Sequence, residues 1–254
     1  MLNRIMIGRY YPISSPVHHM NPVAKLLSMI LYIITIFLCR DIKLMLLLTL
    51  VVFMLYELAH LPRKIYFKTL FSLKFILLFI LVIYYLMGYG LEDVILVCLR
   101  LYVIVLYTTI LTLTTPTSNI TYALKTILTP LKLIGIPVNK MAFSISLALR
   151  FIPTIMDQAS KIMKSQASRG IDYYSSNLAG KFLAIKTMLL PMFILTIRRA
   201  DTLSESMQMR LYDINGKRSS LKRYKWTLFE TFIVFMHVGL MAIIIARMVI
   251  KWNI

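Results

Sequence analysis

Apolar residues in this chain gather into long runs that are separated by short polar segments. The run at 75–91 contains no charged residue, and four other runs meet a charge only near their ends. A helix needs about 17–25 mostly apolar residues to cross the hydrocarbon core of a bilayer. The pattern therefore predicts five membrane-spanning helices, at 26–39, 44–56, 75–91, 94–115 and 231–246.

A different pattern occupies residues 116–225, where apolar residues recur at steps of three and four. This spacing is typical of amphipathic helices, and it predicts a short helix at 118–133 and two long ones at 139–168 and 181–210. Small residues on both apolar stripes would let the long helices cross closely. Gly170 is suited to the left-handed position that ends a helix.

The predicted fold class is an all-α membrane protein with about five transmembrane helices and two long, crossed amphipathic helices on the cytoplasmic side. Three parts follow from it: an N-terminal segment with spans one to four at 1–115, the amphipathic-helix region at 116–225, and the last span at 226–254.

Lysine and arginine are unevenly distributed, and they set the predicted orientation. The formal net charge is +19, and seventeen of the 29 basic residues lie between 116 and 225. Because basic residues stay on the cytoplasmic side of short loops, the N-terminus and the amphipathic helices are predicted to be cytoplasmic. The charge reflects this topology, and no nucleic-acid partner is predicted because no soluble basic domain accompanies it.

Residues that could perform chemistry are scattered. The ten acidic residues, four histidines and two cysteines form no metal-ligand spacing, and no phosphate-binding loop is present, since Gly180-Lys181 is followed by Phe182. The sequence therefore predicts no catalytic, cofactor-binding or metal-ligating residue, and no enzyme activity. Glu57 and Arg100 lie near span ends, where their side chains can reach the interface. His18 and His19 are expected in a solvated turn.

Two stretches of the amphipathic region resemble each other. Residues 159–172 (ASKIMKSQASRGID) and 200–213 (ADTLSESMQMRLYD) align without gaps, and Arg169 matches Arg210 near the end of each long helix. A cation at the C-terminal end of a helix is stabilised by about 0.3–1 kcal/mol, which alone could explain one such arginine. Their duplication favours two similar helix ends offered to two similar partner surfaces, because the guanidinium fork suits acidic or carbonyl-lined grooves.

Three segments, SPVHHMNPVAKLL (15–27), residues 114–172 and RRADTLSESMQMRLYD (198–213), carry a resemblance to a known family. The chain resembles the transmembrane T component of energy-coupling factor transporters, the vitamin and metal-ion importers of the ABC superfamily. That resemblance implies a multi-pass subunit of a bacterial or archaeal cell membrane. It also implies two partners: a pair of ATP-binding cassette ATPase subunits, and a separate membrane subunit that binds the substrate.

The resemblance implies the residues that contact the ATPases as well: Ser168, Arg169 and Gly170 at one helix end, and Met209, Arg210 and Leu211 at the other. Ser168 stands where alanine is usual, and Leu211 stands where glycine commonly follows the second arginine. Leucine disfavours a left-handed backbone. We therefore expect the second helix to run on for a turn, or to present Arg210 at a different angle.

Two alternatives belong to other classes. A membrane-embedded enzyme acting on a lipid or prenyl substrate would need clustered acidic or histidine residues at the interface, and the sequence lacks such a cluster. A secondary permease would favour more spans and an inverted duplication of those spans. The duplication in this chain lies in the amphipathic helices instead.

Overall fold

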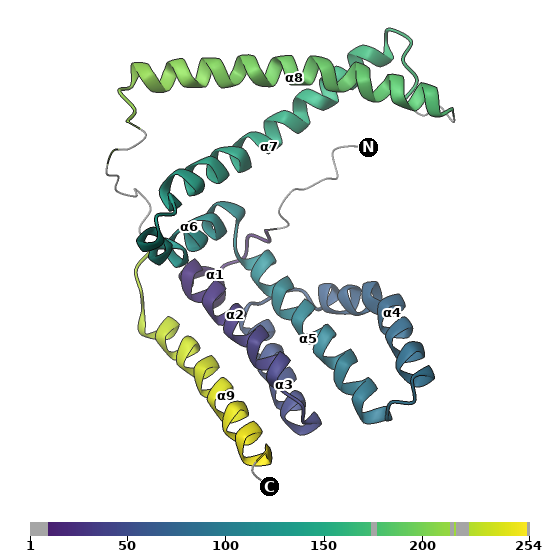
Figure 1. Ribbon diagram of the computed structural model, residues 1–254, viewed down its shortest axis with the longest axis vertical. Coiled ribbons are helices and arrows are strands. Elements are labelled where there is room, and N and C mark those ends of the chain that lie inside the picture. Colours follow the sequence, from purple (N-terminus) through teal and green to yellow (C-terminus); the bar gives the residue numbers. More distant parts are fainter. Residues whose placement is uncertain (1–9, 174–176, 214–215, 217–223, 253–254) are drawn as a thin grey trace. The chain divides into compact units, whose positions relative to one another are not determined.

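The computed structural model describes residues 10–173, 177–213, 216 and 224–252, and every regular element within these residues is a helix (Figure 1). The helices are α1 (Pro16–His19), α2 (Pro22–Leu38), α3 (Ile42–Leu58), α4 (Arg63–Leu86), α5 (Leu91–Thr114), α6 (Thr117–Ile127), a 3₁₀ helix η2 (Thr129–Ile134), α7 (Val138–Ala167), α8 (Leu178–Met209) and α9 (Leu228–Trp252). The predicted all-α class is confirmed.

Contacts group these helices into two units. The membrane unit, Gly8–Pro130 with Lys222–Ile254, contains α1 to α6 and α9. The paired-helix unit, within Leu131–Leu221, contains α7 and α8. By its contacts α6 belongs with the spans, because it packs on α2.

Each of the five predicted spans lies mainly within a helix, although the helix that contains most of the run at 75–91 ends at Leu86. Within the described residues, four helical segments are long and apolar enough to cross a bilayer: Phe67–Leu86, Leu91–Thr114, Gly180–Met209 and Leu228–Ile250. At 17 residues each, α2 and α3 are shorter, and at 1.5 Å per residue they are about 25 Å long. Gly180–Met209 was not predicted as a span, because its sequence pattern is amphipathic.

Four helices build the core of the membrane unit. Tyr32 of α2 stacks on Tyr107 of α5 with ring centroids 4.7 Å apart, and His237 of α9 lies edge-on to both rings. Leu48 of α3 and Val103 of α5 are fully buried in the same cluster. These residues hold α2, α3, α5 and α9 together as one body.

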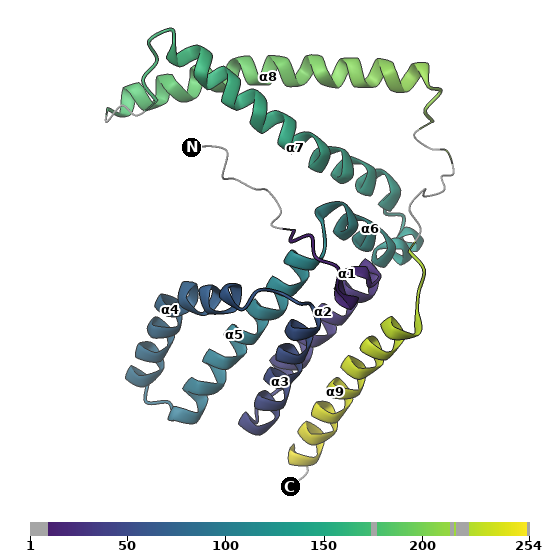
Figure 2. The ribbon, with the colours of Figure 1, turned by 180° about the vertical axis from the view of Figure 1, so that it is seen from behind.

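By contrast, α4 lies at an edge of the membrane unit, beside α5 (Figure 1 and Figure 2). None of the apolar window in Phe67–Leu86 is buried, and Phe75 is 74% exposed. An apolar helix exposed on nearly all sides is stable only where lipid or another protein covers it.

The helices of the membrane unit alternate in direction. The starts of α2 and α9 meet where the Asn21 amide donates to Glu230 (2.9 Å), and their ends share a cleft lined by Leu38 and Ile244. α5 ends where α2 begins, because Lys25 of α2 donates to the Thr114 carbonyl at 3.2 Å. As a result, α5 ends and α9 begins at the same end of the membrane unit.

In the paired-helix unit, α7 and α8 pack against each other in opposite directions. Tyr212, just after α8, contacts Phe143 near the start of α7, with ring centroids 5.3 Å apart. Further along, the Arg199 guanidinium lies 6.0 Å from the centroid of Phe151. Both helices continue through their internal prolines, Pro153 and Pro191.

The predicted apolar stripe of α7 is half-buried in its middle part at Ile152, Ile155 and Ile162, whereas Ile145, Ala148 and Ala167, also predicted to lie on it, are exposed. For α8 the predicted stripe was wrong in its first half. Phe182 is 71% exposed, whereas Ala184 is buried, so the packed face is rotated relative to the prediction. Since α8 is apolar on several sides in that half, spacing alone could not identify the face that packs.

Candidate docking ends and their supports

The end of α7 is closed by a left-handed glycine. Gly170 has a φ of 88°, its amide donates to the Ala167 carbonyl (3.0 Å), and the Ile171 amide donates to the Gln166 carbonyl (3.1 Å). These two bonds form a Schellman motif, which satisfies carbonyls that have no partner within the helix. Arg169 is held at the last position before the reversal, and it is exposed.

The end of α8 repeats this geometry. The Leu211 amide donates to the Gln208 carbonyl (2.9 Å), and the Tyr212 amide donates to the Met207 carbonyl (3.0 Å). Leu211 has a φ of 52°. The expectation that α8 runs on past Arg210 is therefore wrong, because the two hydrogen bonds hold a leucine in a conformation that costs roughly 1–2 kcal/mol.

The structure does not bring the two arginines together. Because α7 and α8 run in opposite directions, Arg169 and Arg210 lie at opposite ends of the paired-helix unit (Figure 1). At 1.5 Å per residue, helices of 30 and 32 residues are about 45–48 Å long. The unit therefore offers two separate contact points with the same local backbone.

The residues beside each arginine differ. Arg169 is flanked by Ser168, whose hydroxyl donates back to the Lys164 and Ser165 carbonyls, and by Gly170. Arg210 is flanked by Met209, 85% exposed, and Leu211, 91% exposed. One end is narrow and polar, whereas the other presents large apolar side chains that a partner could cover.

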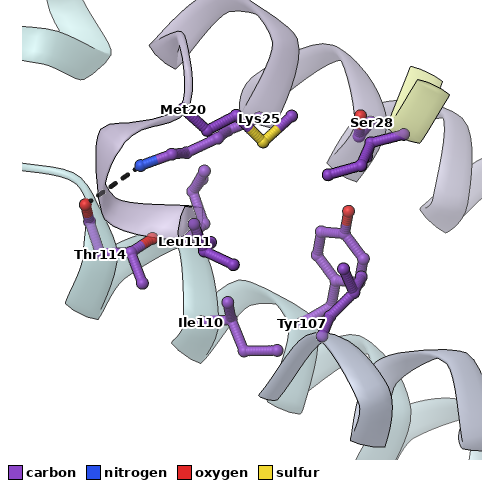
Figure 3. A pocket seen from close by; sticks show the side chains of 10 residues that line it. Met20, Lys25, Ser28, Tyr107, Ile110, Leu111 and Thr114 are labelled. Atoms are coloured by element: carbon purple, nitrogen blue, oxygen red, sulfur yellow. Dashed lines mark hydrogen bonds between the residues drawn. The ribbon is translucent and has the colours of Figure 1, made fainter. Parts of the chain in front are cut away.

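Lys25 is a buried support that reasoning from charge patterns missed. It is 6% exposed, and its ammonium donates to the His18 carbonyl (3.3 Å), the Thr114 carbonyl (3.2 Å) and the Thr115 hydroxyl (3.3 Å). Figure 3 shows its side chain extending to Thr114. Lys25 thereby ties α1 and α2 to the junction between α5 and α6. In the sequence, Lys25 was marked only by its position in segment 15–27, one of the three segments that carry the family resemblance.

Glu230 is a second buried support, at the start of α9, and it was not predicted. It is 3% exposed; its carboxylate accepts from the Asn21 amide at 2.9 Å and from the amide and hydroxyl of Thr227. A buried carboxylate is stabilised by several such donors. Together with Lys25, it fixes the end of the membrane unit from which the chain leaves for α7 and to which it returns from α8.

Of the two histidines expected in a solvated turn, His19 is exposed, whereas His18 is partly buried. Its ring donates from Nε2 to the Tyr11 carbonyl (3.0 Å) and bonds through Nδ1 to the Ser15 hydroxyl (2.7 Å), and Ser15 also caps α1. Partial burial lowers the pKa of His18; the hydrogen bond to the Tyr11 carbonyl opposes this shift, and the positive charge of Lys25 adds to it. The neutral ring therefore helps to hold the turn that Lys25 also contacts.

A small cavity lies between α2 and α5, lined by Lys25, Ser28 and Tyr107 (Figure 3). Its volume is about 30 Å³, enough for roughly one or two water molecules. The Ser28 hydroxyl is buried and has no partner within the protein. This cavity is too small for an organic substrate. Among the described residues, no group of three or more acidic, histidine or cysteine side chains could hold a metal ion.

The fold and these features define a class of protein: a multi-pass membrane protein with two long helices that each end at an exposed arginine. The family model described as "Cobalt transport protein" (CbiQ) matches residues 13–221. The energy-coupling factor transporter transmembrane protein EcfT of Staphylococcus aureus is 35% identical over all of this chain and 99% of its own length.

The EcfT proteins of Bacillus subtilis and Lactococcus lactis are each 32% identical, over 96% and 99% of this chain and 98% and 99% of their own lengths. The chain therefore belongs to the CbiQ family, as the transmembrane component of a bacterial energy-coupling factor transporter. This membership points to a role in transport, in a multi-pass protein of the cell membrane.

Proposed function

We propose that the chain is the coupling subunit of its transporter. Arg169 and Arg210, each with its two flanking residues, insert into grooves on two ATP-binding cassette ATPase subunits. A separate membrane subunit holds the substrate, a vitamin or a metal ion. ATP-driven movement of the ATPases displaces the two docking ends, and α7 and α8 carry this displacement to the substrate-binding subunit.

The observation that carries the proposal is that α7 and α8 each end with an exposed arginine directly before a left-handed residue. The same backbone motif also closes α4 at Gly88, but no arginine precedes it there. Gly170 adopts a left-handed conformation at little cost, whereas Leu211 adopts it against its preference. Strain of this kind often accompanies a functional site, although His60 after α3 has a similar φ of 51° and no assigned role. Presenting an arginine in the same way at two places requires this geometry.

The path of the chain supports a cytoplasmic position for both long helices. Because α5 ends and α9 begins at the same end of the membrane unit, the intervening segment crosses the bilayer an even number of times or not at all. Within its described part, Gly180–Met209 is the one candidate span. A single crossing there would bring the chain back at the wrong end, so α8 lies on the same side as α7.

The first half of α8 supports contact with a substrate-binding membrane subunit. Its exposed side chains include Phe182 (71%), Leu190 (59%) and Phe193 (64%). Apolar side chains this exposed on a helix outside the bilayer mark a protein interface. We assign this surface to the substrate-binding subunit, because the arginine ends are already used by the ATPases.

Energetics determines which contacts persist and which contacts change during the transport cycle. A conformational change is driven only by interactions that differ between its two states. The arginine contacts must persist through the cycle if force is to be transmitted through them. The contacts between α7 and α8, such as Arg199 over Phe151, are those that change.

The test uses the chain expressed with its ATPase and substrate-binding partners. Arg169→Ala and Arg210→Ala should each reduce uptake and ATPase co-purification, because truncating one partner of a buried charge pair costs about 2–5 kcal/mol. The double variant should lose both. Arg150→Ala and Arg198→Ala are matched controls, since these arginines are exposed within α7 and α8 rather than at their ends. Normal uptake and co-purification in the double variant would overturn the proposal.

A further inference from the structure

A cleft lies at the end of the membrane unit opposite to Lys25 and Glu230. It is formed by the turn between α2 and α3 and by the last turns of α9, and its volume is about 440 Å³. Volumes of about 300–1,000 Å³ are typical of sites for small organic ligands. The docking function described above makes no use of this cleft.

The walls of the cleft are amphipathic. Arg40 and Arg247 line it together with one carboxylate, Asp41, and with the apolar side chains of Ile244 and Met248. Asp41 forms an ion pair with Arg247 at 3.7 Å, and both side chains are partly exposed. An exposed ion pair of this kind contributes little to stability. Because the cleft has two guanidinium groups and one carboxylate, it keeps a net positive charge.

The basic residues around the cleft depart from the general charge distribution of the chain. The proposed orientation places this end outside, where lysine and arginine are disfavoured. Of the four basic residues that flank the spans at that end, Arg40 and Arg247 nevertheless line the same cleft. A ligand that requires positive charge at this position accounts for their clustering.

The turn that carries Arg40 is fixed from within the membrane unit. Arg100 of α5 donates from Nη2 to the Cys39 carbonyl at 2.7 Å, and its guanidinium lies 5.9 Å from the ring centroid of Phe37. Cys39 is fully buried. A side chain from a neighbouring span therefore positions the backbone next to Arg40, as expected for a site formed before its ligand binds.

We propose that this cleft binds one anionic phospholipid. Arg40 and Arg247 contact the headgroup phosphate, and an acyl chain lies along Ile244 and Met248. The cleft lies at the ends of three spanning helices, where lipid phosphates are found. Its apolar wall suits a hydrocarbon chain, which a free phosphate ion does not have. Asp41 competes with the lipid for Arg247.

The test is native mass spectrometry of the purified full chain in mild detergent, titrated with phosphatidylglycerol, phosphatidylcholine or diacylglycerol of equal chain length. One phosphatidylglycerol should bind more tightly than the other two lipids. Arg40→Gln combined with Arg247→Gln should weaken its binding about 30-fold, because each basic residue near a lipid surface contributes roughly a factor of five. Asp41→Asn should strengthen binding, since it releases Arg247.

Lys64→Gln with Lys68→Gln is the matched control: it removes the same charge from exposed positions of α4 and should leave binding unchanged. Equal binding of the three lipids, or unchanged phosphatidylglycerol binding in the arginine variant, would contradict the proposal. Displacement of the lipid by millimolar inorganic phosphate would identify a free anion as the occupant instead. Should the arginine variant fail to fold, weaker or equal binding by Asp41→Asn would be decisive against the site.

Discussion

Leu211 adopts a left-handed backbone conformation that a leucine side chain disfavours. Glycine is the usual residue at a left-handed helix end, and Gly170 follows that rule. At Leu211 two backbone hydrogen bonds impose the same conformation on a leucine. Its side chain is 91% exposed, so packing within the chain does not compensate for the strain. In the proposed complex, burial of Leu211 against an ATPase subunit offsets this strain.

This argument predicts opposite effects of two exchanges. Leu211→Gly should stabilise the end of α8 by about 1 kcal/mol, because glycine has no left-handed penalty. Amide hydrogen exchange at Tyr212, whose N–H closes the motif, should slow about fivefold. Gly170→Leu should speed exchange at Ile171 by a similar factor, and open space around Gly170 makes this a purely conformational change. Faster exchange in Leu211→Gly would show that Leu211 is not strained.

Helical elements were predictable from the sequence where one spacing pattern was unambiguous. The runs at 75–91 and 94–115 could only be buried in lipid or protein, and most of their residues lie in α4 and α5, although α4 ends at Leu86, five residues before the predicted end. The packed face of α8 was not predictable, because its first half is apolar on several sides. The end of α8 was also predicted wrongly. Leucine disfavours the left-handed conformation at position 211, whereas the two backbone hydrogen bonds that end the helix require it.

The buried polar residues Lys25 and Glu230 could not be predicted from the sequence, for a different reason. Asn21 and Glu230 are 209 residues apart in the sequence, yet they are joined by one hydrogen bond. Only the parallel packing of α2 and α9 brings them together. Lys25 was counted as part of a charge pattern that sets orientation, whereas in the fold it is a buried donor to three oxygens.

The pairing of α2 with α9 can be tested through Glu230. Glu230→Gln removes a buried charge that accepts from Asn21 and Thr227, and leaving such donors poorly paired costs about 1–3 kcal/mol. The midpoint of thermal unfolding, followed by tryptophan fluorescence, should fall by about 2–8 °C. Glu92→Gln is the matched control, because Glu92 also lies in the first turn of a spanning helix but is exposed. An equal effect of both changes would mean that Glu230 acts only through the helix dipole.

The topology of the whole molecule is tested by determining on which side of the membrane each segment lies. In a background of Cys39→Ala and Cys98→Ala, a single cysteine is introduced as Glu92→Cys or Ser204→Cys; both positions are exposed. A membrane-impermeant maleimide should label position 92 in intact cells and position 204 only after permeabilisation. Labelling of position 204 from outside would show that α8 crosses the bilayer.

The pairing of α2 with α9 also governs how the protein is assembled during translation. Asn21 and Glu230 are 209 residues apart in the sequence, and synthesis proceeds at roughly 5–20 residues per second, so the start of α2 is made about 10–40 s before the start of α9. During that interval the Asn21 amide lacks its acceptor, and the surface of α2 that α9 will cover is open. Nascent chains stalled before α9 should therefore be the form of this protein that insertion factors and quality-control proteases hold longest.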